Sequence, residues 1–334
     1  MVAGSSAVLA GLGGWLPPRV VGNAELAARL DTSDEWIRSR TGIAERRVVD
    51  DGMSTVDMSV AAGGRALRSA GVDRVGAVVL ATATPDQPCP ASAPQVASRL
   101  GQGEAAAFDV NAVCSGFVYA LATAAGLIAA RVVRDVLVVG ADAFTTLLDP
   151  DDRGTVPIFG DGAGAVVLRA GDPGEPGAFG PFDLHSDGDQ AELLIVPAGG
   201  SRQPRPVEPR DRYLRMEGQA VFRHATTRMA ESSRAVLDEL GWTVGEVDRF
   251  VGHQANVRIL STVAKQLGLP ADGLVVNIDR TGNTSAASIP LALVDGVRDG
   301  SLRPGDRVLL AAFGAGFTWG ATGLRWPDLD VDPL

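Results

Sequence analysis

The same order of predicted elements occurs twice along this chain. In the first half, a buried strand and a helix lead to a strand that ends just before Cys114, and a buried helix, a strand, a glycine-rich turn and a last strand follow. In the second half, one strand ends at His253, a helix and another strand lead to Asn283, and the same four elements follow. This repeat predicts two similar α/β halves that meet along their buried helices. Cys114 and Asn283 would then hold equivalent positions, with His253 nearby at the carboxyl end of a strand.

The boundary between the two halves is predicted near residue 172. Residues 171–212 are rich in Gly, Pro, Asp and Arg, which is typical of an irregular excursion. We therefore assign residues 1–172 to an N-terminal half that contains Cys114. Residues 173–334 form a C-terminal half that contains His253 and Asn283.

Cys114 lies in the segment FDVNAVCSGFVYALATAAGLIAA, where a strand is predicted to give way to a buried helix. The run from Phe117 to Ala130 is uncharged, too short to span a membrane and long enough for a core helix. The first turn of a helix has unpaired N–H groups and a partial positive charge, and both favour a nucleophilic thiolate. Free cysteine is also among the most buried residue types, so this segment alone leaves catalysis and packing open.

Charge and cysteine content exclude several classes of function. The formal net charge of −10 disfavours nucleic acid and anionic membranes as partners. The two cysteines, Cys89 and Cys114, cannot supply the disulfide framework of a secreted protein, which favours a reducing cytoplasm. No apolar run reaches transmembrane length, and the run from Ala7 to Leu16 lacks the basic start of a signal peptide.

The glycine-rich segment from Gly160 to Gly164 is not predicted to bind phosphate. Its spacing fits neither the dinucleotide-binding motif nor the P-loop, and a strand follows it where those motifs require a helix. We expect these glycines to permit close backbone packing instead.

Cys114, His253 and Asn283 together provide the groups needed for acyl transfer through a thioester. A cysteine at a helix start is an acylatable nucleophile, a histidine serves as a base or a neutral donor, and an asparagine amide stabilises an oxyanion. The turn from Gly314 to Gly316 can add a backbone N–H. Each residue also has a simpler explanation, such as a core histidine or an N-cap asparagine. Their joint occurrence at repeat-related positions favours catalysis.

The chain resembles the β-ketoacyl-(acyl carrier protein) synthase III family over nearly its whole length. The motifs that carry the resemblance are DTSDEWI (31–37), RTGI (40–43), CSGF (114–117), FGDGAGA (159–165), MEG (216–218), HQAN (253–256), TGNTSAAS (281–288) and FGAGF (313–317). The resemblance implies a thiolase-like α/β fold, in which two similar halves form α-β-α-β-α layers. It also implies a cytoplasmic homodimer.

The resemblance further implies a decarboxylative condensation that begins fatty acid synthesis. Cys114 would accept an acyl group from acyl-CoA, and malonyl-(acyl carrier protein) would then lose CO2 and attack the acyl-cysteine. His253 and Asn283 would stabilise the resulting enolate, while the backbone N–H groups of Cys114 and Ala315 would form the oxyanion hole. No cofactor or metal is implied, because acyl-CoA is a substrate.

Binding residues are implied in the same way, by position within the motifs. Trp36 and Arg153 would enclose the CoA adenine. Other positions that line the CoA and pantetheine path would be Thr32, Arg40, Gly154, Gln219 and Asn256. The segment from Gln254 to Arg258, which contains Ala255, Asn256 and Val257, would dock the carrier protein. Arg258 and Arg223 would supply positive charge for an acidic carrier.

Two positions depart from the family pattern. Val113 precedes the nucleophile where a small residue is common, and only local repacking is expected there. Cys89 stands where acetyl-using members carry a bulky aromatic residue that closes the acyl pocket across the dimer. A small residue there leaves room for a longer or branched primer. Phe313 is the other residue assigned to the acyl pocket.

Other functions compatible with the sequence are a priming ketosynthase of a polyketide pathway and a thiolase-fold acyltransferase that forms an ester or amide. The priming enzyme would share every motif. The acyltransferase often alters the asparagine or the docking segment, and both are intact here. A non-catalytic partner subunit would lack Cys114, and nothing in the sequence positions a water for a cysteine hydrolase.

Overall fold

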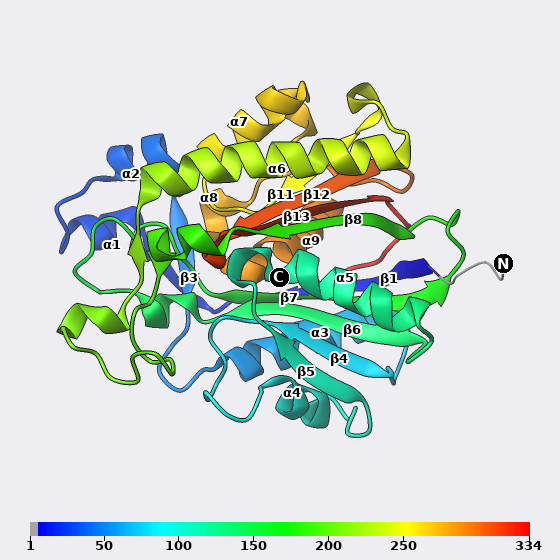
Figure 1. Cartoon of the computed structure of the whole chain (residues 1–334), viewed down its shortest axis with the longest axis horizontal. Helices are drawn as coiled ribbons and strands as arrows, with labels where there is room; N and C mark the ends of the chain where they lie inside the picture. Colours follow the sequence, from blue (N-terminus) through cyan, green and yellow to red (C-terminus); the bar gives the residue numbers. More distant parts are fainter. Residues whose placement is uncertain (1–5) are drawn as a thin grey trace.

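Two mixed β-sheets form the frame of the molecule (Figure 1). The computed structural model describes residues 6–334. The first sheet has five strands in the order β1-β7-β6-β4-β5; they are β1 (Ser6–Trp15), β7 (Gly162–Gly171), β6 (Asp135–Asp142), β4 (Ala77–Ala81) and β5 (Ala106–Val110). The second sheet has four strands in the order β11-β12-β13-β8; they are β11 (Arg249–Gly252), β12 (Arg307–Gly314), β13 (Thr318–Arg325) and β8 (Phe179–Ser186).

Helices form three layers around these sheets (Figure 1). Helices α5 (Gly116–Ala129) and α9 (Ser288–Asp299) lie between the sheets and contact strands of both. The outer face of the first sheet is covered by α3 (Thr55–Ala70) and α4 (Ala93–Arg99), and that of the second by α6 (Gly218–Leu240) and α7 (Val257–Leu267). The order of layers is α-β-α-β-α, which confirms the predicted fold class.

Helix α5 fits between two sheets because its side chains are uncharged and mostly small. Ala120 and Ala124 are fully buried, and each allows a strand to approach the helix closely. Strand β4 is buried at every position, as expected of a strand in the middle of a sheet that is covered on both faces. The segments flanking Cys114 therefore have little freedom to move relative to the frame.

Parallel pairing brings the two chemically important segments to carboxyl strand ends. Strand β4 pairs in parallel with β5 and β6, and β11 pairs in parallel with β12. Strand β5 leads directly to Cys114, and β11 leads to His253. Carboxyl ends of parallel strands are where ligands bind in α/β proteins.

A smaller unit lies beside the two sheets, at the left in Figure 1. It contains the antiparallel pair β2 (Arg19–Gly22) and β3 (Glu45–Val48), with α1 (Asn23–Ala27) and α2 (Asp34–Thr41) between them in sequence. The other short elements are the pair β9 (Leu194–Ile195) and β10 (Arg215–Met216) and the helix α8 (Ile278–Thr281).

The predicted strand before Asn283 does not form. Residues 274–278 make only an isolated bridge, between Leu274 and Phe250, and Ile278 begins α8. The side-chain amide of Gln254 replaces the rest of the ladder, because its Nε2 donates to the Val275 carbonyl at 3.2 Å and its Oε1 accepts from Asn277 N–H at 3.1 Å. The sequence prediction was wrong here because a side chain satisfies the backbone.

The segment of residues 171–212 is also more regular than predicted, since it contains β8 at the edge of the second sheet. All strands of the first sheet end by Gly171, and all strands of the second begin after it. The assignment of two halves at residue 172 stays a prediction. Between residues 6 and 334, no helix is both long and apolar enough to cross a membrane.

Candidate active site

Cys114 lies in a single 3₁₀ turn, η1 (Val113–Ser115), between the end of β5 and the start of α5. The side chain is 6% exposed. Val113 adopts a φ of +48°, a strained conformation for a β-branched residue, and this turn directs the chain abruptly into α5. Gly314 lies so close that a Cβ on it would be 2.9 Å from the Cys114 nitrogen, so a side chain there would displace the nucleophile.

Asn283 precedes a matching 3₁₀ turn, η7 (Ser285–Ala287), which begins with Ser285 at a φ of +51°. The two turns correspond, so Asn111, rather than Cys114, is the counterpart of Asn283. Asn111 Oδ1 accepts from Val113 N–H at 3.4 Å, and Asn283 Oδ1 accepts from Ser285 N–H at 2.9 Å. The predicted equivalence of Cys114 and Asn283 is therefore wrong by three residues, although both lie at the start of a buried helix.

The same bond orients the Asn283 amide. Because its oxygen accepts from the backbone, the Nδ2 group is left as the donor of this side chain. The backbone is held on both sides, since Asn283 N–H donates to the Ile158 carbonyl at 2.9 Å and Gly160 N–H donates to the Asn283 carbonyl at 3.0 Å. A fixed amide donor of this kind is suited to stabilising an oxyanion.

His253 is buried directly after β11, and its backbone N–H donates to the Ala311 carbonyl at 2.8 Å. Its Nδ1 lies 2.7 Å from Ser288 Oγ, which also accepts from Gln254 N–H at 3.3 Å. Ser288 Oγ can thus donate its hydrogen to Nδ1, which leaves the imidazole N–H on Nε2. Burial lowers the pKa of His253 to about 3, so the ring is neutral.

Cys114, His253 and Asn283 line one cavity of about 140 Å³. The rest of its wall is mostly apolar, and it includes Phe313, as predicted for the acyl pocket. Helix α6 contributes Phe222, Ala225 and Met229, which are spaced by three and four residues and so share one helix face. The sequence prediction missed this contribution, although the spacing was visible in the sequence.

The electrostatic environment of Cys114 keeps its side chain protonated at rest. Burial raises the pKa of the thiol to about 12, and the charge of Asp142 acts in the same direction, while the Ser285 hydroxyl opposes the rise. The N–H groups at the start of α5 also favour the thiolate. Burial outweighs the helix-start effect on which the sequence prediction of a thiolate depended.

Asp142 is a further residue that sequence reasoning missed. It is fully buried at the end of β6, and burial raises its pKa. Its carboxyl accepts from Ala83 N–H at 2.7 Å and from Ala286 N–H at 3.1 Å, and so joins the first sheet to η7. In the sequence, a carboxylate directly after an apolar strand could have indicated this residue.

The predicted CoA residues occupy the surface near the smaller unit. The Arg153 guanidinium lies 5.4 Å from the centre of the Trp36 ring and also pairs with Asp31 at 2.7 Å. Asn256 lines the cavity, and its Nδ2 donates to the Arg40 carbonyl at 3.0 Å. Thr32 is half-buried, Gly154 N–H donates to the Asp152 carboxylate, and Gln219 is exposed in the first turn of α6.

The segment predicted to dock a carrier protein needs one correction. Gln254 is fully buried with its amide engaged by the backbone, so it cannot contact a partner. Ala255 and Val257 are half-buried, and Arg258 is exposed. The Arg258 guanidinium lies 5.8 Å from the Phe222 ring, which lines the cavity, and Arg223 is exposed on the same helix as Phe222.

Cys89 lies apart from the cavity in this single chain. It is an exposed free thiol in the loop between β4 and α4. The glycines of the segment 160–164 pack closely, as predicted: a Cβ on Gly160 would be 2.3 Å from the Thr281 carbonyl oxygen, and one on Gly164 would be 2.6 Å from Pro290. Asp161 accepts from Val49 and Thr145 N–H, so this turn serves structure.

Sequence comparison with known proteins gives the same family by profile and by individual relatives. The sequence profile of 3-oxoacyl-[acyl-carrier-protein (ACP)] synthase III matches residues 108–188, and the profile of its C-terminal part matches residues 237–326. Beta-ketoacyl-[acyl-carrier-protein] synthase III 5 of Streptomyces coelicolor is 58% identical over 325 residues, which are 96% of this chain and 98% of that protein. The Pseudomonas aeruginosa PAO1 protein named beta-ketoacyl-[acyl-carrier-protein] synthase III is 53% identical over 97% of this chain and 98% of its own length.

Solved structures agree with the sequence comparison. The crystal structure of 3-oxoacyl-(acyl carrier protein) synthase III from Pseudomonas aeruginosa PAO1 superposes with a TM-score of 0.91 at 52% identity, covering 98% of this chain and all of that one. The priming beta-ketosynthase from the R1128 polyketide biosynthetic pathway has a TM-score of 0.91 at 36% identity, covering 99% of each chain. Since the identity extends over nearly its whole length, this chain belongs to the β-ketoacyl-(acyl carrier protein) synthase III family.

Proposed function

We propose that this enzyme joins the acyl group of an acyl-CoA to malonyl-(acyl carrier protein) with loss of CO2, giving a β-ketoacyl-(acyl carrier protein). The observation that carries the proposal is the convergence of Cys114, His253 and Asn283 on one buried cavity. The family membership supports the same reaction. No metal or cofactor takes part in it.

In the first half-reaction, Cys114 Sγ attacks the thioester carbonyl of acyl-CoA. The carbon–sulfur bond to CoA breaks, and the thiol proton of Cys114 passes to the departing CoA thiolate. The backbone N–H groups of Cys114 and Ala315 are the proposed oxyanion hole. The close packing of Gly314 against the Cys114 nitrogen supports it, because this packing brings the two segments together.

In the second half-reaction, the malonyl carboxylate leaves as CO2 and its bonding electrons form an enolate on the carrier thioester. Neutral His253, through Nε2–H, and Asn283, through Nδ2, donate hydrogen bonds to the enolate oxygen. The enolate carbon attacks the acyl-cysteine carbonyl, Cys114 leaves as a thiolate and it takes up one proton. A neutral histidine fits this role because donation requires no proton transfer.

The substrates reach the cavity from the surface that carries Trp36 and Arg258. Trp36 and Arg153 would hold the adenine of CoA by stacking, and the Arg153 guanidinium, which lies 5.4 Å from the Trp36 ring, would move away to admit the base. Arg258 and Arg223 would attract an acidic carrier protein to the same opening, although the protein as a whole is acidic. Both substrates end in the same pantetheine arm, so one opening can serve both.

A homodimer in the cytoplasm is part of this proposal. Strand β5 pairs only with β4 among the described strands, so its other edge is free to pair with a second copy. Phe108 and Val110 on this strand are only partly buried. A dimer through β5 would bring the Cys89 loop of one subunit toward the other.

The test is a complete reaction with purified enzyme, an acyl-CoA and malonyl-carrier protein. We expect release of CO2 and a carrier protein whose mass matches the β-ketoacyl product. An enzyme that forms esters or amides would leave the carrier unchanged and acylate a hydroxyl or amine acceptor. The likeness to a priming ketosynthase keeps a polyketide role open, and turnover with a polyketide carrier alone would favour that role.

A further inference from the structure

Arg46 is a buried cation that has no acidic partner in the part of the chain from residue 6 to 334. It lies on β3 with 1% of its surface exposed. Its guanidinium donates to the Val21 carbonyl at 2.9 Å, to Asn23 Oδ1 at 2.8 Å and to the Pro157 carbonyl at 2.7 Å. Burial lowers its pKa to about 10, so it remains charged at neutral pH.

Such an arginine is costly to bury, because three neutral oxygens replace the water around a full charge. A hydrophobic residue would fill the same space at lower cost. The advantage of an arginine lies in its geometry, because a planar guanidinium fixes several acceptors at defined angles. Its three acceptors belong to two segments that are far apart in the chain: Val21 and Asn23, at the junction of β2 and α1, and Pro157.

The segment that contains Pro157 also fixes the backbone of Asn283. Pro157 is followed by Ile158 and Gly160, and these two residues make the backbone bonds on either side of Asn283. Arg46 also packs against the same crossing, because a Cβ on Gly282 would lie 2.9 Å from the Arg46 Cβ. Ala44 N–H, at the start of the β3 segment, donates to the Asp279 carbonyl in α8, a second link toward Asn283.

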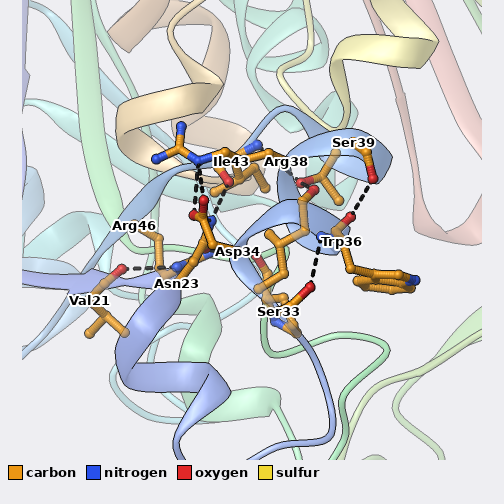
Figure 2. A network of polar contacts seen from close by, with 12 residues as sticks. Val21, Asn23, Ser33, Asp34, Trp36, Arg38, Ser39, Ile43 and Arg46 are labelled. Carbon is orange, nitrogen blue, oxygen red and sulfur yellow. Dashed lines mark hydrogen bonds and ion pairs between the residues drawn. The ribbon is translucent and has the colours of Figure 1, made fainter.

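On its other side, the hydrogen-bond network of Arg46 reaches α2, the helix that carries Trp36. Figure 2 shows Asn23 between Arg46 and this helix. While its oxygen accepts from Arg46, Asn23 Nδ2 donates to Asp34 Oδ1 and to the Ile43 carbonyl, each at 2.8 Å. Asp34 in turn accepts from Arg38 Nε at 2.8 Å, one turn further along α2.

We propose that Arg46 is a positioning residue that fixes the Asn283 amide through residues 157–160, and that Asn23 joins this support to the helix carrying Trp36. The inference rests on the proposed function, in which Asn283 serves the second half-reaction only. Arg46 touches no substrate. Its loss should therefore impair malonyl decarboxylation more than acylation of Cys114.

The test variant is Arg46→Lys, which keeps the charge but replaces the fork by one ammonium group that cannot hold all three acceptors. The matched control is Arg47→Lys on the same strand, whose side chain donates to the Pro17 carbonyl at 3.2 Å. Each protein is assayed separately for acylation of Cys114 by acyl-CoA and for decarboxylation of malonyl-carrier protein. Hydrogen exchange of peptides containing Gly160 and Asn283 is measured on the same proteins.

We expect Arg46→Lys to lower decarboxylation by about 10- to 100-fold, the effect of a small displacement of a catalytic group, with acylation within about threefold of wild type. Exchange at Gly160 and Asn283 should rise in Arg46→Lys and stay unchanged in Arg47→Lys. Equal loss of both half-reactions, or no change in either, would overturn the inference. If Arg46→Lys does not fold, Asn23→Ala, which removes one acceptor of Arg46, should raise exchange of the same peptides; the two half-reactions are not compared in this variant, because Asn23 also supports the helix that carries Trp36.

The two proposals fail in different ways. A wild-type enzyme that neither becomes acylated nor decarboxylates malonyl-carrier protein would end the proposed function. The exchange measurement would still decide on Arg46, because it needs no substrate. An active wild type with unchanged exchange in Arg46→Lys would end the inference alone.

Discussion

His253 differs from an ordinary histidine because its ring is buried and neutral. Its pKa of about 3 lies far below the working range, so lowering the pH to about 5.5 leaves the ring uncharged. Ser288 Oγ is bonded to Nδ1, and burial alone lowers the pKa of the ring. This environment suits a donor that never needs to ionise.

We therefore expect the rate of malonyl-carrier decarboxylation to stay nearly constant between about pH 5.5 and 8. A histidine with an ordinary pKa near 6.5 would lose about 90% of its neutral form at the lower limit. The measurement is CO2 release at saturating malonyl-carrier protein across this range. An acidic limb with a midpoint between pH 6 and 7 would show that His253 is protonated there.

The lowered pKa of His253 also makes the stability of the folded protein depend on pH. The folded pKa of His253 is lower than its unfolded value of about 6.5, so the unfolded chain binds more protons between about pH 3 and 6.5. The contribution of His253 to stability is complete above pH 6.5 and decreases as the pH falls through this window. Asp161 acts in the opposite direction, because burial raises its folded pKa to about 6.

Residue types and their order predicted that Cys114, His253 and Asn283 lie close together, and all three line one cavity; their catalytic roles stay a prediction. Their supports were not predictable, because they depend on which atoms face each other after folding. Ser288 and Asp142 come from other elements than the residues they hold. Gln254 shows the same limit, since its place in a motif suggested surface contact and its amide instead completes a strand edge.

At the scale of elements, the core helix predicted over residues 117–130 forms as α5 (Gly116–Ala129), so the bounds of such helices can be predicted from sequence. Apolar periodicity and cap residues determine them, as in α3, where Ser54 and Asp57 form a capping box at the start and Gly71 ends the helix. The strand predicted at residues 274–278 was wrong. Their apolar composition resembles that of a strand, but their backbone groups bond to the side chain of Gln254. Edge strand β8 was missed because glycine and proline surround it.

The opening formed by α6 and α7 is predicted to bind the carrier protein. Arg258→Glu should raise the apparent KM for malonyl-carrier protein by about tenfold at low salt, and added salt should reduce the difference. Acylation by acyl-CoA should change little, because CoA is held by Trp36 and Arg153. The measurement is the KM for each substrate at two ionic strengths.

Arg298→Glu is the matched control for charge. Arg298 is exposed in the last turn of α9, at the opposite end from Ser288, so the same change in net charge occurs far from the opening. It should leave both KM values unchanged. An equal rise for both substrates in Arg258→Glu would indicate a general defect and remove Arg258 from the docking surface.

At the scale of the whole molecule, the repeated element order predicted two buried helices at the centre, and α5 and α9 lie there between the two sheets. The position of Cys89 relative to an acyl pocket could not be predicted from one chain. Its loop is exposed in the single chain, and its proposed role requires a second subunit. The proposed dimer through β5 would bring this loop to the neighbouring acyl pocket. Its small side chain would then leave space for a longer or branched primer.

We expect wild type to prefer butyryl- or isobutyryl-CoA over acetyl-CoA by about 10- to 50-fold, because two or three extra carbons gain about 0.8 kcal/mol each when buried. Cys89→Phe should fill the space and move the preference toward acetyl-CoA, with decarboxylation unchanged. Acylation rates with the three CoA esters and the mass of the protein in solution are measured together. A monomer, or an unchanged ranking in Cys89→Phe, would contradict the pocket.

The central claim is that Cys114 carries the acyl group between the two substrates. The most direct measurement is the intact mass of wild type and Cys114→Ala after incubation with acyl-CoA, followed by addition of malonyl-carrier protein. Wild type should gain the mass of one acyl group per chain and lose it when the carrier is added, as the carrier gains the corresponding β-ketoacyl mass. Cys114→Ala should gain no mass. An acyl group on Cys89 in that variant, or a wild-type acyl group that malonyl-carrier protein fails to remove, would contradict the account.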